Sequence, residues 1–126
     1  MTERKYNRVL PESEGNVLCL EIGQRVTLDD YVNIFEPPMR AIVAKYSDAR
    51  AVISYTRPFL GWDIDAAEHD IATIAEVGRH VRRIALVHPT EQVAQRWLTF
   101  KPLFGGDVKI FNEGEFDNAL AWAKAE

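Results

Sequence analysis

This sequence of 126 residues has one cysteine, no net positive charge and no long apolar run. Cys19 is the one cysteine, so an internal disulfide is excluded, and its place in the apolar run 17–20 indicates a small buried side chain. The net charge of −4 supplies no positive field that would attract a phosphate backbone, which argues against nucleic acid as a partner. No segment approaches the roughly 20 apolar residues of a membrane span, and no signal-like apolar stretch follows the charged N-terminus. We therefore expect a cytoplasmic protein.

Motifs for nucleotide, cofactor and metal binding are missing as well. Neither GxGxxG nor a Walker-type pattern occurs, so we predict no cofactor, and no GxSxG pattern surrounds Ser54. His69 has Glu68 and Asp70 beside it, but neighbours along a helix do not face one another, so we interpret this stretch as a solvated helix face. We predict neither catalytic nor metal-binding residues. An enzyme that uses His69 or His88 is the less favoured alternative.

What the sequence does contain is the pattern of a single α/β domain that spans residues 1–126. Runs of β-branched residues alternate with segments whose apolar residues recur every three or four positions. Helical crossovers between parallel strands are right-handed almost without exception, so the last three strands should lie parallel with helices on both faces. The expected elements are a hairpin of strands 8–11 and 17–26, an interrupted helix from about 27 to 46, strand 51–55, a helix from about 64, strand 84–87, a helix from about 91, strand 108–111 and a helix from about 115.

Two of these helices contain features that bear on function. Pro37 and Pro38 interrupt the first one, because proline has no amide hydrogen and its ring clashes with the preceding turn. We predict a kink there that acts as a hinge. In the second helix, the apolar positions step by three and four, as on the inner face of an amphipathic helix: Ile64, Ala67, Ile71, Ile74, Gly78 and Val81.

Large apolar side chains are more numerous near one end of the predicted sheet than a core requires. The predicted loop 59–62 contains three of them, although connecting loops run over the surface and favour polar residues. Ligands in open α/β sheets bind beside the carboxyl ends of the strands, where this loop lies. We interpret the surplus as an apolar ligand-binding pocket lined by Phe59, Leu60, Trp62, Trp97 and Phe100. A plug that closes the core and a subunit interface are the alternatives.

One basic cluster follows the second helix, at Arg79, His80, Arg82 and Arg83. Cations at a helix C-terminus interact favourably with the negative end of the helix dipole, which is the simplest explanation. Polybasic patches also attract anionic lipid headgroups, so peripheral membrane contact through Arg79, Arg82 and Arg83 stays open.

Three stretches have a distinctive sequence: residues 9–18 (VLPESEGNVL), residues 61–63 (GWD) and residues 113–123, which include ALAW at 119–122. In this order and spacing they resemble the SpoIIAA-like family of small bacterial proteins, which is related in fold to STAS domains (sulfate transporter and anti-sigma-factor antagonist). The resemblance implies a STAS-like three-layer α/β domain with a mixed sheet of about five strands, an N-terminal hairpin and four helices. It also implies a homodimer and, through similarity to the CRAL-TRIO lipid-binding fold, a carrier of small nonpolar ligands at a membrane surface.

The chain departs from the sporulation antagonists among STAS proteins at one place. Those proteins have a phosphorylatable serine at the start of the corresponding helix, where this sequence has residues 59–63 (FLGWD) and no hydroxyl. We therefore expect a non-enzymatic binding protein for a small nonpolar, lipid-like ligand. The alternative is a STAS-like protein–protein interaction module without that serine, with Trp97 and Phe104 at the interface.

Overall fold

The computed structural model describes residues 7–125, apart from the side chains of Gln24 and of residues 57–59. The strands are β1 (Arg8–Val9), β2 (Val17–Val26), β3 (Ala49–Trp62), β4 (Val81–Val87) and β5 (Asp107–Phe111). The helices are α1 (Leu28–Asp30), α2 (Glu36–Tyr46), α3 (Ile64–Val77), α4 (Glu91–Phe100) and α5 (Phe116–Lys124). A π-helical segment (Tyr31–Phe35) joins α1 to α2, and short 3-10 turns follow α3 (Gly78–His80) and α4 (Lys101–Leu103).

The five strands form one mixed sheet in the order β1-β2-β3-β4-β5. β1 pairs antiparallel with β2, whereas β2, β3, β4 and β5 run parallel to one another. This arrangement confirms the predicted mixed sheet with an N-terminal hairpin. It also adds β2 to the three strands for which the sequence predicts parallel pairing.

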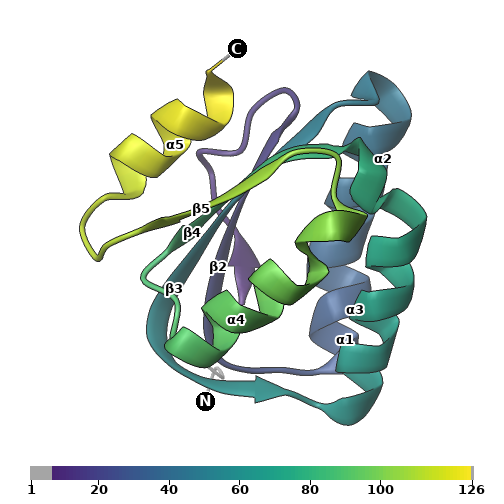
Figure 1. Ribbon diagram of the computed structural model, residues 1–126. Helices are drawn as coiled ribbons and strands as arrows, with labels where there is room; N and C mark the ends of the chain where they lie inside the picture. Colours follow the sequence, from purple (N-terminus) through teal and green to yellow (C-terminus); the bar gives the residue numbers. More distant parts are fainter. Residues whose placement is uncertain (1–6, 126) are drawn as a thin grey trace.

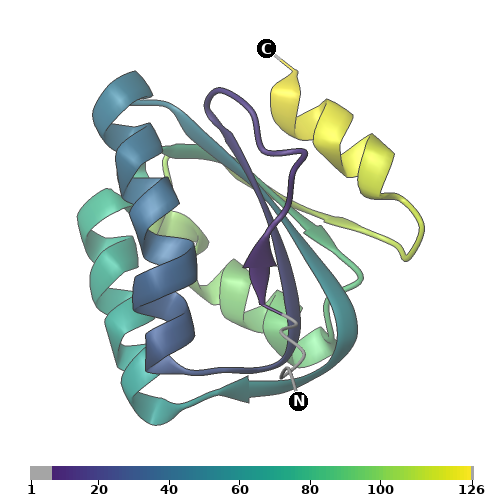
Figure 2. The same cartoon turned by 180° about the vertical axis from the view of Figure 1, so that it is seen from behind.

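Two helical layers of unequal size cover the sheet. Figure 1 shows α5 alone on one side of the sheet, and Figure 2 shows from behind that the other helices lie on the opposite side. Because side chains alternate along a strand, β2 directs Leu18 and Leu20 towards the larger layer and Val17 and Cys19 towards α5. The domain therefore has three layers and two separate apolar cores.

The predicted interruption of the first helix is confirmed and takes the form of a wide turn. Pro37 and Pro38 lie in the first turn of α2, directly after the π-helical segment. Neither proline can donate to the carbonyl four residues earlier, so a regular α-helix cannot run through this point. The amide of Glu36 donates instead to the carbonyl of Tyr31, five residues back. Upstream, Thr27 caps α1 through a capping box, as its position predicts.

The prediction of a loop at residues 59–62 is wrong, because β3 continues beside β2 as far as Trp62. Between Tyr55 and Phe59 the strand uses four residues while β2 uses two, so a bulge forms. Pro58, which has no amide hydrogen for the ladder, lies within this bulge. Proline and glycine indicate a loop locally, but pairing with a strand far away in the sequence decides the conformation here.

The inner face of α3 also differs from the prediction. Ile64 and Ile71 point to solvent, with relative exposures of 80% and 40%. Of the predicted stripe, Ile74, Gly78 and Val81 are buried, but the last two lie beyond the end of α3. The face that packs inward is formed by Ala66, Asp70, Thr73, Ile74 and Val77. These residues also recur at helical spacing. Because Asp70 and Thr73 are polar, however, the sequence pattern suggests that this side of the helix faces solvent.

Candidate functional site

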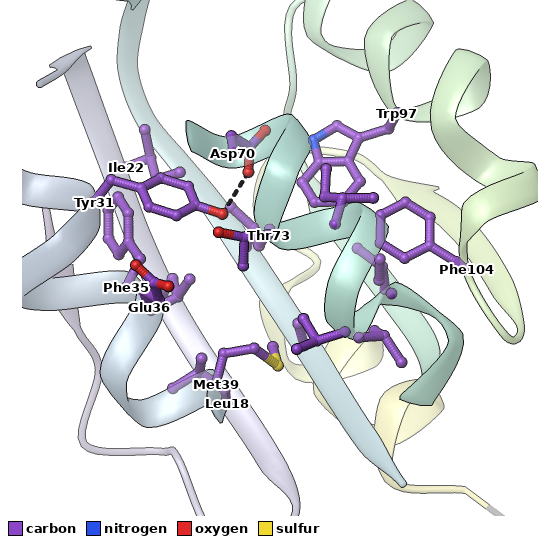
Figure 3. Close-up of a pocket in the computed structure, with 18 of the residues that line it drawn as sticks. Leu18, Ile22, Tyr31, Phe35, Glu36, Met39, Asp70, Thr73, Trp97 and Phe104 are labelled. Atoms are coloured by element: carbon purple, nitrogen blue, oxygen red, sulfur yellow. Dashed lines mark hydrogen bonds between the residues drawn. The ribbon is translucent and has the colours of Figure 1, made fainter. Parts of the chain in front are cut away.

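A cavity of about 100 Å³ lies between the sheet and the larger helical layer (Figure 3). Strands β2, β3 and β4 supply its floor, and the π-helical segment, α2, α3 and α4 surround the rest. The rings of Trp97 and Phe104 stack with their centroids 5.5 Å apart and form one wall. The apolar lining consists of Leu18, Leu20, Ile22, Phe35, Met39, Ala51, Ile53, Trp62, Ile74, Val77, Val81, Ile84, Trp97 and Phe104.

A hydrogen-bonded network of three side chains, Tyr31, Asp70 and Arg96, lies at one end of this cavity, and Figure 3 shows its contact between Tyr31 and Asp70. The Tyr31 hydroxyl donates to Asp70 Oδ1 at 2.6 Å, and Arg96 donates to Asp70 Oδ2 at 2.9 Å. The Asp70 and Arg96 side chains are mostly shielded from solvent, with 13% and 21% exposure. The Arg96 guanidinium also lies over the rings of Trp62 and Phe100, at 4.3 and 5.1 Å from their centroids. These hydrogen bonds thus link the π-helical segment, α3 and α4 around the cavity.

A second polar group in the lining is Glu36. Its Oε1 lies 2.6 Å from His69 Nε2, and Arg40 donates to its Oε2 at 2.6 Å. Burial raises the pKa of Glu36, but the hydrogen bonds from His69 and Arg40 outweigh burial, so its pKa is lowered overall. The interpretation of His69 as part of a solvated helix face is therefore wrong. His69 is half-buried, and its partner lies 33 residues earlier in the sequence.

The hydroxyl groups of the lining are held in their neutral form. Burial raises the pKa of Tyr31, and the neighbouring Asp70 carboxylate raises it further. Burial also raises the pKa of Tyr55, whose hydroxyl accepts a hydrogen bond from Trp97 Nε1 at 3.3 Å. Thr73 contributes a third hydroxyl, which donates to the backbone carbonyl of residue 69 at 2.9 Å. The lining therefore presents uncharged tyrosine hydroxyls to the cavity.

The structure brings two of the five predicted pocket residues to the cavity. Trp62 and Trp97 line it. Leu60 is 62% exposed, and Phe100 packs beneath Arg96 outside the lining. The side chain of Phe59 lies outside the described residues. The cavity therefore lies beneath the helical layer, deeper than the rim position expected from the sequence.

Sequence reasoning missed the polar part of the lining, which is Tyr31, Glu36, Asp70 and Thr73. A signal existed in α3, where Asp70 and Thr73 fall on one helical stripe with the buried Ala66. Tyr31 and Glu36 gave no local signal, because their partners on α3 lie more than 30 residues away.

A second cleft, of about 500 Å³, opens at the carboxyl ends of β4 and β5, beside residues 54–56 in the middle of β3. Ligands bind at the carboxyl ends of strands in many α/β folds. This cleft contains Ser54, Thr56 and His88, and His88 Nε2 lies 3.7 Å from a carboxylate oxygen of Glu113. Both members of this pair are more than half exposed, so their attraction is weak. Among residues 7–125, no group of three or more His, Cys, Asp or Glu side chains could hold a metal ion.

The basic cluster is only partly available for contact with other molecules. Arg83 donates to the backbone carbonyl of Trp122 at 2.6 Å, at the end of α5, and its guanidinium lies 5.2 Å from the Trp122 ring. Arg79 and Arg82 are exposed. Within the described part of the chain, no helix has both the length and the apolar character needed to cross a membrane.

Comparison with known proteins supports the fold described above. The SpoIIAA-like family matches the chain over residues 17–124. The chain is also similar to the crystal structure of an uncharacterised protein of the DUF3478 family with a SpoIIAA-like fold from Shewanella loihica PV-4. The two share 20% sequence identity over 98% of this chain and 99% of that one, with a TM-score of 0.67, so the likeness concerns the fold alone. No curated protein matches the chain.

The SpoIIAA-like family matches most of the sequence, and the similar crystal structure is also described as having a SpoIIAA-like fold. The chain therefore belongs to the SpoIIAA-like family.

Proposed function

We propose that this chain is a non-enzymatic binding protein that holds a small nonpolar, lipid-like molecule in the cavity beneath the larger helical layer. One observation carries this proposal: an apolar cavity of about 100 Å³ persists inside a domain of 126 residues. Protein interiors normally pack with few voids larger than a water molecule. A comparable apolar cavity of about 150 Å³ in another protein stays dry and binds benzene or xenon. A somewhat smaller one suits a compact apolar molecule or one end of a longer chain.

The driving force would be the removal of ligand surface from water. At roughly 25 cal/mol per Å², burial of about 200 Å² of ligand surface contributes roughly 5 kcal/mol before the cost of lost ligand freedom. We therefore expect dissociation constants in the high micromolar to millimolar range for ligands that fill only the cavity. Longer chains should bind more tightly if the helical layer opens.

Entry of a ligand would require movement of the π-helical segment and α2. Tyr31 and Phe35 from the segment line the cavity, and π-helical turns frequently occur at functional sites. We propose that Pro37 and Pro38 form the hinge, since the helical hydrogen bonding is already broken there. The contacts from Tyr31 to Asp70 and from Glu36 to His69 would hold the closed state.

Native mass spectrometry of gently purified full-length protein tests the proposal directly. We expect an added mass that organic extraction removes, or saturable binding of members of a panel of fatty alcohols, isoprenoids and fatty acids. A clean protein mass together with no saturable binding across the panel would contradict the carrier function.

Tryptophan fluorescence can locate the ligand. Trp97 lines the cavity, whereas Trp122 packs in the core on the α5 face. Titration with 1-hexanol should change the emission of the wild type and of Trp122→Phe, and most of the change should be lost in the double variant Trp62→Phe, Trp97→Phe, because Trp62 lines the same cavity. Equal responses from the two variants would place binding elsewhere.

A second candidate is a STAS-like interaction module in which two copies of the chain form a homodimer. It is favoured by exposed apolar residues near the start of α3: Leu60, Ile64 and Ile71, with relative exposures of 62%, 80% and 40%. Trp97 and Phe104, the interface residues expected from the sequence, are half-buried and line the cavity instead. The first residues of α3 include no hydroxyl, so switching by a phosphoserine at that position is not part of this candidate.

Light scattering over a range of protein concentrations distinguishes the two candidates. A dimer that Ile64→Glu converts to a soluble monomer, while the control Ala121→Glu on the exposed side of α5 does not, would support the interaction module. A wild-type protein that is monomeric at all concentrations would contradict the interaction module.

Peripheral membrane contact remains a further expectation, now limited to Arg79 and Arg82 because Arg83 is engaged at α5. Flotation with vesicles containing phosphatidylglycerol should recover the wild type, and the double variant Arg79→Gln, Arg82→Gln should lose this binding. Equal recovery with vesicles of pure phosphatidylcholine would contradict an electrostatic contact.

A further inference from the structure

We infer that the cavity selects neutral ligands whose polar end donates a hydrogen bond, such as aliphatic alcohols, and rejects carboxylates such as fatty acid anions. The inference rests on the proposed binding function and adds the chemical class of the ligand. It follows from the charges and hydrogen-bonding groups that line the cavity.

The charges of the lining disfavour an anionic ligand. Among the described lining residues, Glu36 and Asp70 are carboxylates, and none is Arg, Lys or His. The groups that pair with them, Arg40, His69 and Arg96, lie outside the lining, at 2.6 to 2.9 Å from the carboxylate oxygens. A ligand carboxylate would therefore enter next to two negative groups with no cation to pair with, and burial of an unpaired charge is costly.

A cationic ligand is disfavoured for a different reason. Asp70 is already paired with Arg96, and Glu36 with Arg40, so each carboxylate has its counter-charge. An alkylammonium head would lose its hydration and would gain only a weak attraction to a carboxylate whose charge is already balanced by an arginine. A neutral head loses much less on entry.

The Tyr31 and Thr73 hydroxyl groups present acceptors rather than donors to the cavity. The Tyr31 hydroxyl gives its proton to Asp70, and the Thr73 hydroxyl gives its proton to a backbone carbonyl within α3. Each oxygen keeps lone pairs that can accept a hydrogen bond, and so do the carboxylates. Figure 3 shows the Tyr31 and Thr73 oxygens close to each other on the polar side of the cavity. A ligand hydroxyl placed there can donate, whereas an ester or ketone oxygen cannot.

A matched ligand series tests the inference on the full-length protein. 1-Hexanol, hexanoate and hexylammonium share one alkyl chain and differ in the head, and NMR titration of backbone amides at pH 7.5 gives their affinities. We expect 1-hexanol to bind about tenfold or more tightly than either ion. Equal or tighter binding of hexanoate or hexylammonium would overturn the selectivity and leave the carrier function standing. No binding of any of the three, nor of benzene, would overturn the carrier function itself.

A conservative variant tests the role of the hydroxyl. Thr73→Val keeps the side-chain shape and removes the acceptor, so 1-hexanol should bind about threefold to tenfold more weakly while benzene binds unchanged. The control is Thr99→Val on α4, which removes an exposed hydroxyl with the same kind of hydrogen bond, to the carbonyl of Gln95 at 2.8 Å. Unchanged hexanol affinity in Thr73→Val would overturn the proposed head-group contact. Since the ligand series uses the wild type, it decides the question even if this variant folds poorly.

Discussion

The two faces of the sheet are covered in different ways. On the α5 face, Ala119 and Ala123 are fully buried, so a single helix with small inward residues approaches the strands closely. On the other face, the helices touch one another through large rings and side-chain hydrogen bonds such as that between Tyr31 and Asp70, and a cavity remains beneath them. The contrast indicates that the size of the inward residues, together with polar contacts between the helices, decides whether a face is filled or hollow.

The largest difference should appear when one aromatic ring is removed from each face. Phe111→Ala should lower the free energy of unfolding by about 3–5 kcal/mol, because the ring is buried and packs against Trp122. Phe104→Ala should cost only about 1–2 kcal/mol, since this ring is half-buried and already borders a cavity. Urea denaturation measures both values. Equal losses would mean that the two faces are packed alike.

Adding volume should produce the next largest difference. Ala119→Leu has no space to fill on the α5 face and should cost about 1–3 kcal/mol. Ala51→Leu directs the same added group into the cavity, so its stability should stay within about 1 kcal/mol of the wild type while hexanol binding is lost. Thermal unfolding and ligand titration measure the two effects. Ala121→Leu on the exposed side of α5 is the control for the substitution itself.

Removal of one hydrogen bond between helices should have a smaller effect. Tyr31→Phe leaves Asp70 with Arg96 but without the hydroxyl at 2.6 Å, so we expect a loss of about 1.5 kcal/mol in urea denaturation. Tyr46→Phe, at an exposed position of α2, should change stability by less than about 0.5 kcal/mol. A Tyr31→Phe variant as stable as this control would show that the contact does not hold the helices together.

The smallest effect concerns pH. The pKa of Glu36 in the folded protein lies below its ordinary value of 4.5, so its charged form adds stability that is fully present above that value. The contribution is lost as the pH falls through the lowered pKa. The stability difference between the wild type and Glu36→Gln should therefore shrink on acidification below pH 4.5, as measured by urea denaturation at several pH values. Glu68→Gln, at an exposed position of α3, should show no such trend.

Local signals in the sequence were sufficient for most of the fold. Thr27 and Thr90 accept hydrogen bonds from the third residue of their helices, as N-cap positions predict. The interruption of the helix at Pro37 and Pro38 could be predicted because it follows from the proline ring itself and does not depend on contacts with distant residues. Cys19 is buried on the α5 face, and desolvation raises the pKa of its thiol to about 11, as expected for an inert structural cysteine.

The rest depended on partners far away in the sequence. The extension of β3 to Trp62 depends on β2, and no local pattern could outweigh the loop signal of Pro58. The inward direction of Asp70 depends on Tyr31 and Arg96, which come from two other helical elements. At the candidate site, Trp62 and Trp97 could therefore be predicted from apolar composition, while the polar part of the lining required the tertiary structure.

The π-helical segment Tyr31–Phe35 determines which side chains of this helix line the cavity. Tyr31 and Met39 are eight positions apart, and at about 100° per residue they would diverge by about 80° around an ordinary helix. The extra residue in the turn absorbs one step, so both side chains look into the same space. Deletion of one residue there would leave seven positions, or about 700° of regular winding, so the two side chains would still lie on nearly the same face. An extra residue in a helix can thus keep two side chains together across a spacing at which regular winding would separate them.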